Sequence, residues 1–128
     1  MSWFHLIFGI LLFIVFAVTG KFMRIDFPDK EAIPQELRLL MRSRHIYILF
    51  SALIHLVLGT YYQVGKQTAA KILQYSGSVS LTAASLFLVW AFVSETYTLQ
   101  HFSDISRNGI YLSLVGVGLH LLTRIEKR

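Results

Sequence analysis

Four long runs of apolar residues, separated by shorter polar segments, divide the chain. A helix needs about 20 mostly apolar residues to cross the hydrocarbon core of a bilayer. The runs therefore predict four membrane-spanning helices, over residues 3–23, 45–62, 72–96 and 109–123. The last run is the shortest, so its helix is expected to include flanking residues at both ends. The predicted fold is all-α: a bundle of four transmembrane helices that forms a single domain over residues 1–128.

The polar connection that precedes the second run contains a helix signal of its own. Pro34 suits the first turn of a helix, and Glu36 would lie near the positive end of the helix dipole. Residues 35–42 are mostly strong helix formers. We expect a helix that starts in the membrane interface and continues into the second run. Arg38 and Arg42 are four residues apart and share a face of this helix, which suits lipid headgroups or a specific anionic ligand.

Small and weakly polar residues recur at helical spacing within every run. Helices in lipid associate through such residues, because they let two backbones approach closely. We therefore expect these faces to point into the bundle, while large apolar residues face lipid or fill gaps. The predicted inward faces consist of His5 and Gly9 in the first run, Ser51, His55 and Gly59 in the second, Ser76, Ser80 and Ala84 in the third, and Gly109, Ser113, Gly116 and His120 in the fourth.

The composition agrees with a membrane environment. Hydrophobic residues make up 55% of the chain, against roughly 45–50% in soluble domains, and charged residues make up 15%, against about 25%. A soluble domain of this size could not cover its surface with so little charge. The net charge of +5 comes from basic residues that flank the apolar runs, so the expected partner is the lipid bilayer and not nucleic acid.

The sequence also limits the chemistry that the chain can perform. It has no cysteine, which excludes disulfide bonds, thiolate metal ligands and thiol redox chemistry. Acidic residues within the runs are too few for a carboxylate metal site, and the sequence contains no phosphate-binding loop or nucleophile motif. We therefore predict no catalytic residue and no metal site, and an enzyme is the less expected class.

Three histidines, His5, His55 and His120, lie on the inward faces of three different runs. An imidazole at membrane depth should face protein and be hydrogen-bonded. The simplest interpretation of His55 is a neutral ring bonded to a serine hydroxyl or a backbone carbonyl of a neighbouring helix. The alternative is a cofactor site, in which two of these imidazoles ligate the iron of haem b or contact a quinone. Counted from the start of its run, His55 lies deeper than the other two, which weighs against a shared site.

A second group of candidates lies at the opposite ends of the runs. Glu95 stands near the end of the third run, on the side of the membrane shared by Arg42, Arg44 and Arg107. We expect these residues to form an interfacial ion pair or to bind a lipid headgroup.

Small size, short connections and small-residue faces on every run favour a non-catalytic function. The first hypothesis is an accessory or structural subunit that acts through helix packing, with copies of itself or other membrane subunits as partners. The alternative is a haem b or quinone-linked redox protein that uses His55 with His120 or His5. A transporter or channel ranks last, because the runs contain few charged groups to line a path.

Residues 42–62 and 109–122 resemble segments of small bacterial membrane proteins. The resemblance implies a multi-pass protein of the bacterial inner membrane and implies no activity. Lys and Arg are distributed almost evenly over the two sides of the predicted bundle, so its orientation in the membrane stays open.

Overall fold

The computed structural model describes residues 2–27, 29, 31–95, 99 and 104–125. Within this part of the chain the structure contains four helices and no strand: α1 (Trp3–Asp26), α2 (Gln35–Tyr61), α3 (Thr68–Ser94) and α4 (Asp104–Ile125). Each helix lies over one of the four apolar runs, so the all-α prediction is confirmed. α4 extends beyond its run at both ends, as expected, and residue 96 of the third run lies outside the described residues.

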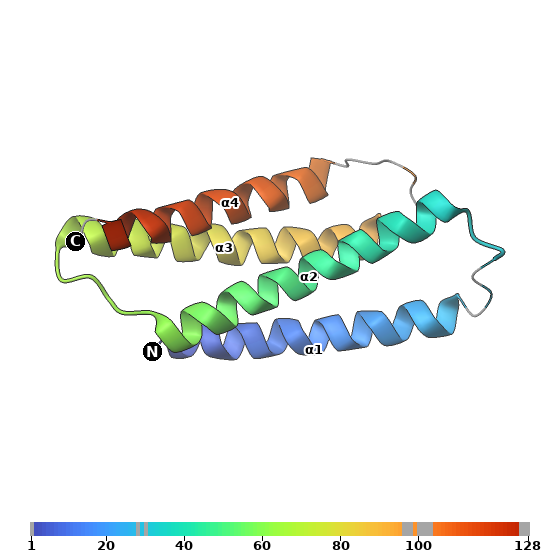
Figure 1. Ribbon diagram of the computed structural model, residues 1–128, viewed down its shortest axis with the longest axis horizontal. Coiled ribbons are helices and arrows are strands. Elements are labelled where there is room, and N and C mark those ends of the chain that lie inside the picture. The colour runs from blue at the N-terminus through green and yellow to red at the C-terminus, as the bar shows by residue number, and fades with distance from the viewer. Residues whose placement is uncertain (1, 28, 30, 96–98, 100–103, 126–128) are drawn as a thin grey trace.

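The helices form two antiparallel pairs (Figure 1). α1 packs along α2, α3 packs along α4, and contacts between α2 and α3 hold the two pairs together. α1 begins and α4 ends at the same end of the bundle, where α2 also connects to α3, and we call this the terminal end. The connection from α1 to α2 and the start of α4 lie at the other end, which we call the distal end.

α2 is one uninterrupted helix of 27 residues, longer than the apolar run that it contains. It begins at Gln35, directly after Pro34, and the backbone amide of Arg38 donates to the carbonyl of Pro34 (3.1 Å). The helix predicted from Pro34 and Glu36 is therefore present as an extension of α2. This extension leads directly into the turn that holds Arg44, and it fixes where this side chain enters the distal end of the bundle.

The distribution of side chains is inverted relative to that of a soluble protein. Among the described residues, eleven buried side chains are polar or charged and ten are hydrophobic. Large apolar side chains are instead exposed along every helix, for example Phe13 on α1, Phe50 on α2, Leu86 on α3 and Leu114 on α4. In water this arrangement would expose far more contiguous apolar surface than soluble monomers tolerate.

Three helices in the described part of the chain, α1, α2 and α3, are long and apolar enough to cross a membrane. Their length and composition suggest a membrane protein. α4 is the shortest helix, with 22 residues, and its first turn is polar because it holds Asp104 and Arg107.

The predicted inward faces of α1, α2 and α4 are confirmed, because their small residues and histidines are buried or half-buried. The prediction is wrong at one position of α3: Ser76 is exposed, whereas Ser80 and Ala84 are buried. α3 packs against both α2 and α4, so its buried surface is wider than a single line of small residues. That surface also includes Gln74 and Ser85.

The close approach of α1 and α2 depends on Gly59. A Cβ atom at this position would lie 2.7 Å from the backbone nitrogen and the Cα atom of Leu6 on α1, far inside van der Waals contact. The same approach allows the backbone amide of Ser2 to donate to the carbonyl of Gly59 (3.1 Å). A residue without a side chain is therefore required where the two helices meet at the terminal end.

Replacing Gly59 with Ala should destabilise the protein, because backbone atoms of α1 block the added methyl group. We expect a cost of roughly 1–3 kcal/mol from overpacking, larger than the gain of up to about 1 kcal/mol from better helix propensity. Gly118→Ala on α4 is the matched control, since a Cβ atom there has no described neighbour within 4 Å. Thermal unfolding in detergent, followed by circular dichroism, should show a lower midpoint for G59A than for G118A. Equal midpoints would contradict the packing described here.

Candidate functional site

Two histidines from neighbouring helices meet at the terminal end of the bundle. The Nδ1 atoms of His5 on α1 and His55 on α2 are 2.8 Å apart, which is a hydrogen bond between two buried rings. Antiparallel packing produces this contact, because the start of α1 lies beside the end of α2. The depth difference expected from residue counting is therefore wrong, since the count started from the other end of α2.

Two serines of α3 extend this contact into a chain of hydrogen bonds across the bundle. Ser78 Oγ lies 2.9 Å from His5 Nε2 and 3.3 Å from Nε2 of His120 on α4. Ser85 Oγ lies 3.2 Å from His55 Nε2. The contacts follow the order Ser85, His55, His5, Ser78, His120, and we call these five residues the histidine–serine chain. It joins all four helices, and it bonds both ring nitrogens of His5 and of His55.

The connection from α2 to α3 closes over the histidine–serine chain. Gln74 of α3 holds this connection in place: its side-chain oxygen accepts from the backbone amide of Gly65 (2.8 Å), and its nitrogen donates to the carbonyl of Gln63 (3.0 Å). The hydroxyl of Tyr62 donates to the same oxygen (3.4 Å). The ring of Tyr62 lies against two histidines of the chain, at centroid distances of 6.0 and 5.6 Å.

Two lateral grooves flank the histidine–serine chain. One lies between α1 and α3, has a volume of about 780 Å³, and includes His5 and Ser78 in its wall. The other lies between α2 and α4, has a volume of about 410 Å³, and includes His120. Tyr62 and Gln74 line both grooves. Each groove is otherwise lined mainly by apolar side chains.

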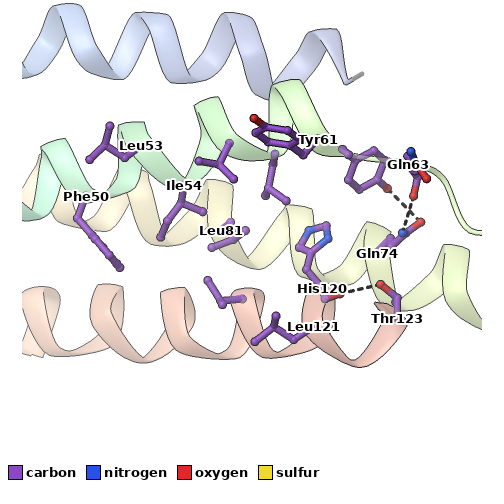
Figure 2. Close-up of a pocket in the computed structure, with 14 residues that line it drawn as sticks. Phe50, Leu53, Ile54, Tyr61, Gln63, Gln74, Leu81, His120, Leu121 and Thr123 are labelled. Carbon is purple, nitrogen blue, oxygen red and sulfur yellow. Dashed lines mark hydrogen bonds between the residues drawn. The ribbon is translucent and has the colours of Figure 1, made fainter. Parts of the chain in front are cut away.

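Figure 2 shows the groove between α2 and α4. Phe50 and Ile54 of α2 and Leu121 of α4 line its apolar part, and His120 and Gln74 lie toward the terminal end. Apolar grooves of several hundred Å³ with a few converging polar groups are the usual form of a small-molecule site. Both grooves have this form, and the histidine–serine chain supplies part of the polar end of each.

The structure thus brings together the three histidines that the sequence singled out. It also adds three polar residues of α3 that sequence reasoning missed, Gln74, Ser78 and Ser85. Ser78 and Ser85 are seven residues apart, two helical turns, so they share a face. This spacing could have indicated the shared face of Ser78 and Ser85. The parallel line of small residues through Ser80 and Ala84 was chosen as the inward face in its place.

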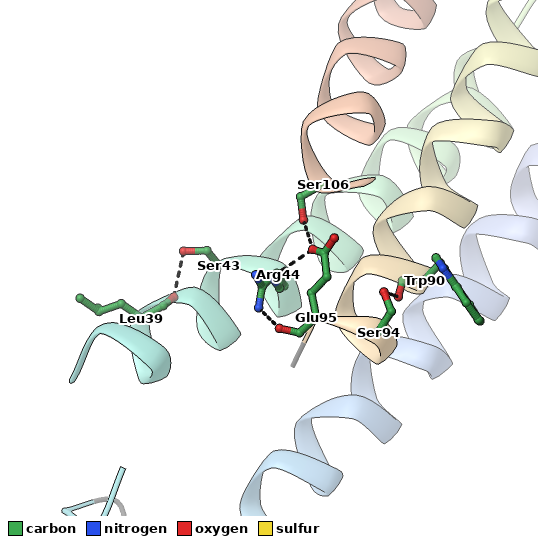
Figure 3. Close-up of polar contacts among 7 residues, drawn as sticks. All are labelled: Leu39, Ser43, Arg44, Trp90, Ser94, Glu95 and Ser106. Atoms are coloured by element: carbon green, nitrogen blue, oxygen red, sulfur yellow. Dashed lines mark hydrogen bonds and ion pairs between the residues drawn. The ribbon is translucent and has the colours of Figure 1, made fainter. Parts of the chain in front are cut away.

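A buried ion pair occupies the distal end (Figure 3). Nε of Arg44 on α2 lies 3.5 Å from Oε2 of Glu95, the residue directly after α3, and both side chains are buried. Another guanidinium nitrogen of Arg44 donates to the backbone carbonyl of Glu95. Ser106 of α4 donates to Oε2 of Glu95 (3.0 Å). The three residues therefore tie α2, the end of α3 and the start of α4 together.

The other two arginines predicted for this region lie apart from the ion pair. Arg107 pairs with Asp104, one turn away on α4, and both side chains are exposed. Arg42 is exposed beside Arg38, where both line a cavity of about 60 Å³ between the end of α1 and the start of α2. The four predicted residues therefore divide into one buried pair and two exposed cations.

His45 lies on α2 toward the distal end and serves as a comparison for the clustered histidines. Its Nδ1 atom lies 3.1 Å from Thr19 Oγ1 on α1. Its ring stacks on Phe16, with centroids 4.1 Å apart and an interplanar angle of 16°. These contacts explain the position of the His45 side chain by packing between α1 and α2.

Replacing Glu95 with Ala should destabilise the bundle strongly, because it leaves the guanidinium of Arg44 buried without its carboxylate. Breaking a buried pair in this way typically costs about 3–5 kcal/mol. Asp104→Ala is the control, since it removes a carboxylate from an exposed pair, where the net contribution is small. Unfolding by titration with a denaturing detergent should separate the two variants. A Glu95 variant as stable as the Asp104 variant would show that the buried pair does not hold the distal end.

No protein family model, no curated protein and no solved structure matches this chain. The described residues include no group of three or more His, Asp or Glu side chains arranged to hold a metal ion.

Proposed function

We propose that the chain is a multi-pass integral membrane protein of a bacterial inner membrane, with all four helices in the bilayer. The inverted distribution of side chains supports this proposal. In hydrocarbon, apolar side chains need no cover, whereas polar side chains need partners inside the protein. α4 belongs to the membrane bundle because it packs along α3 and supplies His120 to the histidine–serine chain.

Within this membrane protein, the terminal end binds a lipid-soluble molecule of the quinone class. The observation that carries this proposal is the convergence of His5, Ser78 and Tyr62 on the wall of an apolar groove of about 780 Å³ between α1 and α3. A quinone presents carbonyl oxygens on a flat ring, and the hydroxyls of Ser78 and Tyr62, which now donate to Gln74, are the donors that would turn toward them. Its apolar tail would lie against Val79 and Ala83 and leave the groove toward lipid.

Of the two cofactors considered from the sequence, the geometry favours a quinone over haem. Iron bound axially by two imidazoles separates the ligating nitrogens by about 4 Å, twice a metal–imidazole distance of about 2 Å. The facing nitrogens of His5 and His55 are 2.8 Å apart and bonded to each other. Ser78 likewise fills the space between His5 and His120. A quinone requires no separation of these rings, because it occupies the groove beside them.

The accessory-subunit function predicted from the sequence stays a prediction. Its support would be a face of the bundle reserved for a partner helix. The exposed apolar side chains of α1, such as Ile7, Leu11 and Phe13, suit acyl chains and a partner helix equally well. The groove between α1 and α3, in contrast, has the hydroxyls of Ser78 and Tyr62 in its wall, which a ligand oxygen would engage and an acyl chain would not.

Filling the groove between α1 and α3 should weaken quinone binding. Ala83→Leu adds apolar volume to the wall without removing a hydrogen-bonding group. Ala17→Leu, on the exposed face of α1, is the matched control. We expect decylubiquinone to quench the tryptophan fluorescence of the purified protein saturably, because Trp3 lies between the groove residues Ser2 and Phe4. The dissociation constant should rise at least about tenfold in A83L, which corresponds to about 1.4 kcal/mol, and stay unchanged in A17L.

Two results would contradict this proposal. Unsaturable quenching of the unsubstituted protein would mean that decylubiquinone only partitions into the detergent. Equal affinities of A83L and A17L would place any bound quinone outside the groove between α1 and α3.

A further inference from the structure

The hydroxyl of Ser78 lies at the centre of three hydrogen-bond contacts and has one proton to give. Its oxygen lies 2.9 Å from the carbonyl oxygen of Gln74, 2.9 Å from His5 Nε2 and 3.3 Å from His120 Nε2. A hydroxyl donates one hydrogen bond and accepts up to two. The direction in which Ser78 donates therefore determines which ring nitrogens of the two histidines carry a proton.

The histidine–serine chain is fully satisfied in two opposite directions. In the first, His120 donates to Ser78, Ser78 to His5, His5 to His55 and His55 to Ser85. In the second, Ser85 donates to His55, His55 to His5, His5 to Ser78 and Ser78 to His120. In the first direction the last serine, Ser85, donates to the carbonyl one turn before it in α3 (2.8 Å). Every ring stays neutral in both arrangements, and reversal between two such arrangements is what proton relay along a hydrogen-bonded chain requires.

The middle of this chain connects the two grooves. Ser78 and His5 line the groove between α1 and α3, together with the titratable side chains of Tyr62 and Lys71. His120 lines the groove between α2 and α4, where Tyr62 is again present. Ser78 contacts His120 directly, so these two side chains bridge the two grooves.

We propose that His120 and Ser78 relay protons from the groove between α2 and α4 to a ligand in the groove between α1 and α3. This inference rests on the proposed function, and it applies to the quinol form of the ligand, whose oxygen is an anion when deprotonated. The anionic ligand oxygen takes the hydroxyl proton of Ser78, Ser78 takes the Nε2 proton of His120, and His120 takes a proton at Nδ1 from a hydronium ion, which is left as water. Three protons each move by one step, so that one positive charge in net reaches the ligand and neutralises it; no electron moves, and Ser78 and His120 end neutral.

His5 is a positioning residue in this relay. It holds Ser78 through Nε2 and is itself held by His55 through Nδ1. Because Ser78 and His5 share a hydrogen bond, the ring protons of His5 exchange with water through Ser78 and His120. This exchange takes place without any ligand, so it reports on the relay separately from quinone binding.

The test is the rate at which ring protons of His5 exchange with solvent, measured by nitrogen-15 NMR on the ligand-free protein in detergent. Ser78→Ala removes the hydroxyl, and His120→Phe removes the imidazole that supplies it. Each substitution should slow exchange at His5 at least about tenfold, since it removes the path to the second groove. Ser78→Thr keeps a hydroxyl and should stay close to the unsubstituted rate. The ring of His45, bonded to Thr19, is the internal control and should be unaffected by all three.

Unchanged or faster exchange at His5 in S78A would overturn the relay. So would equally slow exchange in S78A and S78T, because the effect would then come from packing and not from the hydroxyl. Decylubiquinone binding to A83L is a separate measurement, since Ala83 lines the groove but is not part of the histidine–serine chain. Absence of saturable quinone binding to the unsubstituted protein, with Ser78-dependent exchange intact, would refute the proposed function and leave the hydrogen-bonded path in place.

Discussion

A polar side chain that is surrounded by hydrocarbon has no water to bond, so it must find its partner inside the protein. In the membrane bundle that we propose, this constraint accounts for the buried polar groups. Histidines, serines, a glutamine and an ion pair are buried beside apolar residues such as Ile48 and Leu81, and many large apolar residues lie outside. Glycines such as Gly59 bring the helices close enough for these polar groups to meet. The hydrogen bonds of His5 and His55 are therefore part of what holds the four helices in register.

The two ends of the bundle satisfy this constraint in different ways. At the distal end, Arg44 and Glu95 carry opposite charges, and Ser106 gives the carboxylate a further bond. Such a pair has one favourable arrangement, and removing either partner is costly. At the terminal end, the histidine–serine chain can be bonded in either of two opposite directions. The distal end is thus suited to fixing the helices, and the terminal end is where we propose ligand binding and proton transfer.

Most of the fold could be predicted from the sequence, because the length and polarity of each run determine a helix by local chemistry. The helical extension before the second run could also be predicted, from Pro34 and Glu36. The candidate site could be predicted only in part. His5, His55 and His120 stood out because imidazoles are unusual in apolar runs, whereas a serine in a helix is unremarkable until a neighbour approaches it. The rotation and axial position of α3 between α2 and α4 decide which of its serines face the histidines. Neither quantity can be derived from a single sequence.

The same reason explains the outcome at the distal end. By position along the chain, Arg42, Arg44 and Arg107 were equally plausible partners of Glu95. Asp104 lies one turn before Arg107 and pairs with it locally, while burial selects Arg44 for Glu95. Long-range partners of charged residues are thus decided by packing, and local partners by spacing along the helix.

In the bilayer arrangement that we propose, the outward faces of all four helices contact lipid. α4 gives the most direct test of this arrangement, because it is the shortest of the four helices. The chain has no cysteine, so single spin labels can be placed at positions 113, 114 and 115 without other changes. Leu114 and Val115 are exposed and Ser113 is buried. In proteoliposomes, labels at 114 and 115 should collide with dissolved oxygen more than with a water-soluble nickel complex, and the label at 113 should be shielded from both. Preferential collision of the labels at 114 and 115 with nickel would place α4 in water and contradict the account.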